Sequence, residues 1–145
     1  MPKGRRFCDF DVEITAVACE PGAAGSKVLS VNYRGRAPGG FGHVFGTLTL
    51  EAENAGTIEL CAVSFRDDGS ISNGSGKGTF RRVGDCWTTS LIAYSTLSPT
   101  MYIEAVLDLD ARTWTGIASE WLPETRTNSR QTLDWSRSWP TSGAA

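Results

Sequence analysis

Hydrophobic and polar residues alternate along most of the chain, in short runs separated by turns rich in Gly, Asp, Asn and Pro. The first run, residues 8–19, shows the pattern well. One face carries Phe10, Val12, Ile14, Ala16 and Ala18, and the other face is mostly acidic. A period of two is typical of a strand with one buried face. No segment keeps the 3.6-residue period of an amphipathic helix, so the pattern predicts an all-β protein.

Eight strand-like segments follow one another along the chain. They are residues 8–19, 27–34, 43–53, 57–66, 70–82, 86–95, 100–110 and 112–121. Their connections are mostly short, which makes sequential neighbours pair antiparallel. A closed barrel removes the unpaired edges that such a sheet would otherwise expose. We therefore predict an eight-stranded antiparallel up-and-down β-barrel. A β-sandwich is the alternative, but it would need longer crossovers than this chain supplies.

The length of 145 residues suits one domain with a hydrophobic core. We expect a single domain over residues 1–145, with the barrel at about 8–121 and a C-terminal arm at 122–145. The arm is polar, but Leu133, Trp135 and Trp139 give it apolar anchors. We expect it to fold back over the barrel or to add a ninth strand.

Charge and composition exclude several classes of function. A net charge of −2 provides no field that would gather nucleic-acid phosphates or an anionic membrane surface. The basic start of the chain resembles an export signal, but Asp9, Asp11 and Glu13 interrupt the apolar run that should follow. The chain also lacks an apolar stretch long enough to span a bilayer. We expect a cytoplasmic protein that contacts neither nucleic acid nor membrane.

Cysteine spacing argues against a metal site. The four cysteines include no Cys-x-x-Cys pair, and His43 is the only histidine, so a zinc site is not expected. The cysteines are Cys8, Cys19, Cys61 and Cys86. In a cytoplasmic protein we expect them to be reduced and mostly packed.

A glycine ladder marks the fifth segment. Gly74, Gly76 and Gly78 alternate along it and share a face with Phe80. If this face points inward, the missing side chains leave a hollow, and an eight-stranded barrel has room for one small ligand. Alternatively, the glycines permit a bend that helps to close the barrel. Both interpretations remain open, and both can hold together.

Three polar side chains interrupt otherwise apolar faces near predicted strand ends: Tyr33, Arg66 and Glu120. A carboxylate at an apolar barrel mouth would have a raised pKa and could exchange protons near neutrality. An arginine there could hold a carboxylate or enolate oxygen, and a tyrosine could donate a hydrogen bond to a carbonyl. These residues are the candidate catalytic groups, although strand ends also commonly return to solvent.

Aromatic side chains are the other chemical resource, because indole walls suit flat or polyene ligands. The same side chains are also needed simply to fill a small barrel. The candidate ligand-contacting residues are Trp87, Trp114, Met101, Leu91, Gly76 and Phe80. The motifs that nucleotide cofactors and nucleophilic serines require are missing, so we expect no cofactor.

The strand count, the Asp67-Asp68-Gly69 hairpin, the glycine ladder and Trp114-Thr115-Gly116 resemble the lipocalin-like barrels. These include the allene oxide cyclase-like barrels of bacterial natural-product pathways. The likeness is architectural and covers most of residues 8–121. It implies a cofactor-free enzyme of secondary metabolism that folds a flexible hydrophobic substrate and promotes its cyclisation or isomerisation.

Two hypotheses follow. The first is a cyclase or isomerase in which Glu120, Arg66 and Tyr33 polarise a hydrophobic, oxygen-bearing substrate. The second is a non-catalytic barrel that binds a hydrophobic small molecule. The enzyme hypothesis predicts at least two ionisable groups that converge inside the lumen, whereas the binding hypothesis predicts a nearly apolar lumen. A filled barrel that acts through protein partners is a third hypothesis, and a second copy of the chain is a further candidate partner.

Overall fold

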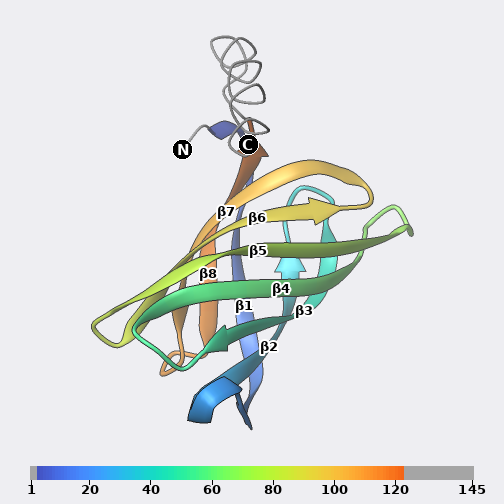
Figure 1. Ribbon diagram of the computed structural model, residues 1–145. Helices are drawn as coiled ribbons and strands as arrows, with labels where there is room; N and C mark the ends of the chain where they lie inside the picture. The colour runs from blue at the N-terminus through green and yellow to red at the C-terminus, as the bar shows by residue number, and fades with distance from the viewer. Residues whose placement is uncertain (1–2, 123–145) are drawn as a thin grey trace, which may run out of the picture.

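The structure, a computed structural model, describes residues 3–122 as one closed antiparallel barrel (Figure 1). Its strands pair in sequence order, and β1 closes the ring by pairing with β8. The strands are β1 (Lys3–Pro21), β2 (Lys27–Ala37), β3 (Gly42–Glu51), β4 (Ala55–Phe65), β5 (Ile71–Val83), β6 (Cys86–Ser95), β7 (Ser98–Asp108) and β8 (Thr113–Trp121). A short 3₁₀ turn, η1 (Ala23–Gly25), joins β1 to β2. The predicted fold is confirmed. The predicted arm lies outside the described residues, apart from Leu122.

Closure depends on the length of β1, which has 19 residues. Its first part, up to Glu13, pairs with β8, and the part from Glu13 onward pairs with β2. One strand thus satisfies the backbone groups of both neighbours, which removes the sheet edges in this part of the barrel. β1 begins at Lys3, five residues before the predicted start.

A register shift interrupts β1 between Ile14 and Ala16. Before it, Val12 and Ile14 are buried inside the barrel. After it, Val17 pairs with the inward-facing Val31 and Ala16 with the outward-facing Asn32, although Val17 is itself exposed beyond the part of β1 that pairs with β8. The expectation that Ala16 and Ala18 continue the inward face is therefore wrong, because one extra residue in a strand reverses the facing of those that follow.

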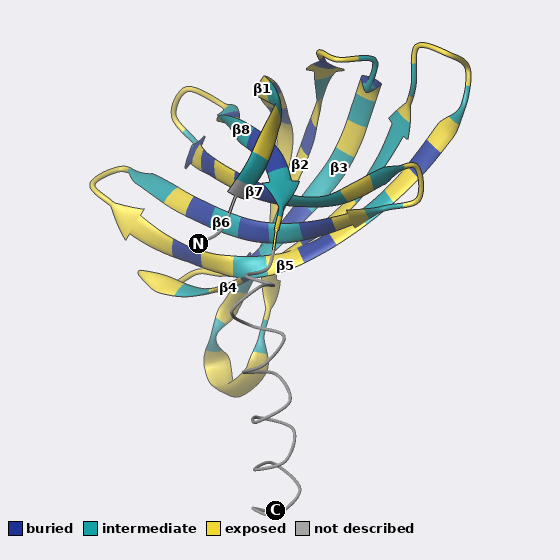
Figure 2. Cartoon of the chain, turned by 90° about the horizontal axis from the view of Figure 1, so that it is seen from above, coloured by how far each residue is buried: buried dark blue, intermediate teal, exposed yellow. Residues whose placement is uncertain are grey.

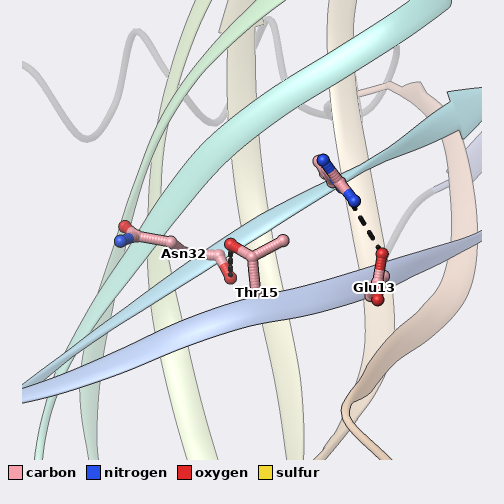
Figure 3. Close-up of polar contacts among 4 residues, drawn as sticks. Glu13, Thr15 and Asn32 are labelled. Carbon is pink, nitrogen blue, oxygen red and sulfur yellow. Dashed lines mark hydrogen bonds and ion pairs between the residues drawn. The ribbon is translucent and has the colours of Figure 1, made fainter.

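Polar contacts on the outer surface flank this shift (Figure 3). Arg34 Nε lies 3.4 Å from Glu13 Oε1, and Thr15 Oγ1 donates to the backbone oxygen of Asn32 at 3.3 Å. All of these side chains are exposed. Exposed pairs of this kind typically add little to stability, so they mark the solvated side of the β1–β2 pair.

The two ends of the barrel differ in packing. We call the end where β1 begins and β8 ends the terminal end, and the opposite end the packed end. Buried and exposed residues alternate along the strands (Figure 2). The largest fully buried side chains lie from the middle of the barrel toward the packed end. They are Leu48, Ile58, Leu91, Leu107, Val31 and Thr89.

Tyr33 lies further inside the barrel than predicted. β2 continues to Ala37, so Tyr33 is within the strand and not at its end. The pairing of β2 with β3 continues past Tyr33 through Gly35 and Arg36, although the Gly-rich sequence there suggested a loop. A sheet partner can hold glycine in a strand despite its low intrinsic preference.

The cysteines are only partly packed. All four are free, but Cys19 and Cys61 are exposed, whereas Cys8 and Cys86 are half-buried. Cys61 occupies an outward position of β4, and Cys19 lies beyond the part of β1 that pairs with β8. The expected packing is therefore wrong for these two. Within residues 3–122, no helix is long and apolar enough to cross a bilayer.

Candidate functional site

A cavity of about 120 Å³ occupies the half of the barrel nearest the terminal end. All eight strands contribute to its wall, and it is partly open to solvent. Among residues 3–122, no Asp, Glu, Lys, Arg or His side chain lines it. An engineered cavity of roughly 150 Å³ lined by Leu, Ile and Phe binds benzene, so this volume suits a molecule or group about the size of one aromatic ring.

Small residues explain why this half is hollow. Ala62, Gly74, Ala93 and Ala118 line the cavity, whereas large aliphatic side chains fill the packed end. A Cβ atom added at Gly74 would come no closer than 3.4 Å to any neighbour, so the missing side chain leaves usable space.

The other two glycines of the ladder have a different role. A Cβ at Gly76 would lie 2.9 Å from the backbone oxygen of Ile92. A Cβ at Gly78 would overlap the backbone oxygen of Ser90 and lie 2.7 Å from the Cα of Leu91. These two positions permit β6 to approach β5 closely. Gly74 thus leaves cavity space, which is one of the two predicted uses, whereas Gly76 and Gly78 permit close strand approach, a role distinct from the predicted bend.

An aromatic cluster lies where the cavity meets the packed end. The ring of Trp114 lies 5.2 Å from that of Tyr33 and 5.0 Å from that of Phe10, measured between centroids. Trp114 Nε1 donates to Thr89 Oγ1 at 3.1 Å, and this hydroxyl donates to the backbone oxygen of Ala105 at 2.9 Å. The buried indole is therefore satisfied and held in one orientation.

Tyr33 is the only one of the three candidate catalytic residues that lines the cavity. Its ring packs over Gly46 on β3, where a Cβ atom would overlap it. The side chain is only 6% exposed, and burial raises the pKa of its phenol well above the usual range. The phenol is consequently neutral near pH 7 and suited to hydrogen bonding rather than to proton abstraction.

Arg66 lies just beyond the end of β4, beside the cavity rather than in its wall. Its guanidinium carbon is 5.1 Å from the ring centroid of Phe41, and Phe41 does line the cavity. Its Nη1 is buried and has no hydrogen-bond partner among the described residues. The backbone N–H of Arg66 donates to the backbone oxygen of Ser70 at 2.9 Å, which fixes the β4–β5 turn.

Glu120 is the penultimate residue of β8 and pairs with Met101 on β7. A Cβ added at Gly4 would lie 2.8 Å from its Oε1, which places the carboxylate beside the start of β1. It does not line the cavity. The structure therefore places Arg66, just after β4, and Glu120, on β8, at the terminal end, and Tyr33 deeper inside.

The six predicted ligand contacts divide between the two halves of the barrel. Trp114 and Met101 line the cavity. Phe80 is 3% and Leu91 1% exposed within the packed core, and Gly76 is buried outside the cavity wall. Trp87 is half-buried at the packed end, where Arg82 lies 5.8 Å from its ring. Alternation predicts which face of a strand points inward, but not which level along the barrel stays empty.

Sequence reasoning missed several residues of the site. Ser64, Ser72 and Ser95 line the cavity near its opening, together with the half-buried Cys8 and with Phe41 from the β2–β3 connection. Burial, with the charge of Asp9, raises the pKa of the Cys8 thiol. The sequence offered one signal for this group: Ser64 places a hydroxyl on the otherwise apolar inward face of its strand.

Groups that could hold a metal do not cluster in the described part of the chain, where no three His, Cys, Asp or Glu side chains lie together. His43 is exposed, and its cross-strand partner Phe65 is exposed as well.

The architecture agrees with that of a lipocalin-like barrel, an eight-stranded antiparallel meander. Comparison with known proteins adds nothing more specific: no family model, characterised protein or solved structure matches this chain.

Proposed function

We propose that this barrel binds a small hydrophobic molecule in the cavity at its terminal end. The observation that carries the proposal is a partly open cavity whose wall, as far as the described residues form it, contains no charged side chain. Sites for small molecules are typically concave and mostly apolar, with a few placed polar groups. Of the two hypotheses from the sequence, a nearly apolar lumen favours binding, since the catalytic one requires converging ionisable groups.

The volume bounds the ligand and its affinity. Cavities for drug-sized ligands are typically about 300–1,000 Å³, so about 120 Å³ accommodates one ring or a short chain, with any further atoms extending through the opening. A ligand of roughly ten heavy atoms gaining about 0.5 kcal/mol per atom would bind with a Kd near 0.2 mM. We expect dissociation constants in the micromolar to millimolar range.

Two valine variants on β5 test the proposal. Gly74→Val places a side chain in the cavity, whereas Ser75→Val places the same side chain on the exposed face one residue later. With toluene as the probe, calorimetric titration should show saturable binding to the wild type and to Ser75→Val. Gly74→Val should bind at least tenfold more weakly. Equal binding by the two variants, or none by the wild type, would refute the proposal.

A second candidate function is cofactor-free cyclisation or isomerisation of the bound molecule. It is favoured by one observation, the neutral phenol of Tyr33 in the cavity wall, which could polarise a carbonyl. In that case Tyr33→Phe should abolish turnover of a substrate while its affinity changes less than tenfold. Unchanged turnover in Tyr33→Phe would exclude this role for the phenol.

A further inference from the structure

Serine hydroxyls form a row along one side of the cavity opening. Ser64 on β4 pairs with Ser72 on β5, and Ser72 Oγ lies 2.5 Å from Ser95 Oγ on β6. Ser95 in turn pairs with Ser98 at the start of β7. The first three line the cavity, whereas the deeper wall is apolar. The cavity is therefore almost entirely apolar, and its serine hydroxyls are gathered at the terminal end.

The Arg66 guanidinium lies next to this row. Arg66 is the next residue after Ser64 on the same face of the β4 segment, because facing alternates along an extended chain. Three buried donors at the terminal end have no hydrogen-bond partner among residues 3–122: Arg66 Nη1, Ser98 Oγ and Trp121 Nε1. Leaving a buried polar group unpaired typically costs about 1–3 kcal/mol, and more when the group is charged.

Nearby carboxylates are bonded elsewhere. Asp67 Oδ1 accepts from Arg36 at 2.5 Å, and Asp68 Oδ1 accepts from the backbone N–H of Ser70 at 2.9 Å. Glu120 lies at the same end, but beside Gly4 on the β1–β8 side. Hydrogen bonds from Ser70 and, to a smaller extent, the charge of Arg66 lower the pKa of the Asp68 carboxyl, so this carboxylate lies near the guanidinium. None of the ion pairs among residues 3–122 involves Arg66, however, and its unpaired Nη1 can still donate to an anion.

We infer that the ligand is a small amphipathic carboxylate. Its apolar body occupies the cavity against Trp114 and Met101, and its carboxylate accepts hydrogen bonds from Arg66 and from the one hydroxyl of the Ser72–Ser95 pair whose proton is not used between them. Ser64 Oγ is not such a donor, because it donates to the backbone oxygen of Phe41. This inference rests on the proposed binding function and adds the chemical class of the ligand. A guanidinium matches the planar geometry of a carboxylate, and Phe41 holds the guanidinium from one side.

A matched pair of probes tests the inference on the unmodified protein. In 4-phenylbutanoate and 4-phenylbutanamide, the apolar body is the same, and only the charge of the head group differs. We expect the carboxylate to bind about tenfold more tightly at low salt, equivalent to about 1.4 kcal/mol. Raising the salt concentration should reduce this preference, because the opening is partly exposed.

Two arginine variants test whether Arg66 is the group that binds the carboxylate of the ligand. Arg66→Met should remove the preference for the carboxylate and leave the affinity for the amide within about twofold. Arg81→Met, an exposed arginine on β5 near the packed end, serves as the control and should keep the full preference. Thermal melting verifies that each variant is folded. Should Arg66→Met fail to fold, the comparison of the two probes on the wild type still decides the charge preference.

The outcomes separate the two proposals. Binding of the amide and the carboxylate with equal affinity would overturn the carboxylate inference and leave the binding function intact. A preference that persists in Arg66→Met would also overturn it, because another group would then hold the anion. Failure of both probes and of toluene to bind would overturn the binding function as well.

Discussion

The sharpest structural prediction concerns alanine substitutions in the glycine ladder of β5. Gly74 and Gly78 lie four residues apart on the same face of one strand, and neither has a positive φ angle. Neither substitution therefore forces a side chain into the left-handed region, and the clearest difference between the two is the space around the new methyl group. At Gly74 the nearest atom is 3.4 Å away, whereas at Gly78 the methyl would overlap a backbone oxygen of β6.

The expected energies have opposite signs. Replacing glycine by alanine where the fold tolerates it stabilises a protein by about 0.4–1 kcal/mol, through the lower entropy of the unfolded chain. Overpacking typically costs about 1–3 kcal/mol, and here β6 backbone rather than a flexible side chain must move. We expect Gly78→Ala to lose roughly 3 kcal/mol of unfolding free energy, which corresponds to a decrease in Tm of roughly 10 °C.

Urea denaturation followed by circular dichroism measures both variants against the wild type. Gly74→Ala should match or slightly exceed the wild-type stability. If Gly78→Ala were as stable as Gly74→Ala, β6 would not approach β5 as described. The account of the ladder as space at one end and close strand approach at the other would then be wrong.

Two further predictions concern packing and thiol reactivity. Leu48→Ala, at a fully buried position of β3, should lose about 2–5 kcal/mol of unfolding free energy in urea titrations. Toluene should bind the cavity at the terminal end of this variant no more weakly than that of the wild type, because Leu48 does not line that cavity. Weaker binding by the folded variant would show that the cavity extends to Leu48. In mass-spectrometric labelling with iodoacetamide at pH 8, the exposed Cys19 and Cys61 should react first. Cys8 should react more slowly, because burial raises the pKa of its thiol and leaves less thiolate at that pH. Toluene should slow the labelling of Cys8 but not of Cys86, which has a raised pKa but does not line the cavity; equal slowing at both would count against a ligand at the terminal end.

The sequence predicted the barrel because period-two alternation and short turns act locally and agree with one another. It mispredicted the second part of β1, where the irregularity between Ile14 and Ala16 reverses the facing of later residues. Nothing in Thr15 or its neighbours signals this irregularity, since it depends on pairing with β2 and β8. Tyr33 was placed at a strand end because Gly35 suggested a loop, but β3 holds that segment in the sheet.

The sequence could predict which side chains of the candidate site face the barrel interior, but not how far along the barrel axis the empty space lies. Trp114 and Phe80 both face inward, as alternation indicates, yet only Trp114 borders the cavity. Which half of a barrel stays hollow depends on the summed volumes of side chains from all the strands, so small residues at Ala62, Gly74 and Ala93 matter only in combination. The burial of Arg66 Nη1 likewise involves Phe41, which lies in the β2–β3 connection. A local sequence pattern around Arg66 cannot reveal a contact with a residue so far away along the chain.

Methyl NMR spectra recorded during a titration with toluene test most directly whether the terminal half of the barrel binds a ligand. The account predicts saturable shifts at Met101, Ile103 and Ala93, whose side chains border the cavity, with little change at Leu48 or Ile58 in the packed half. Spectra that remain unchanged, or that shift first at exposed methyls such as those of Ile71 and Val106, would contradict it.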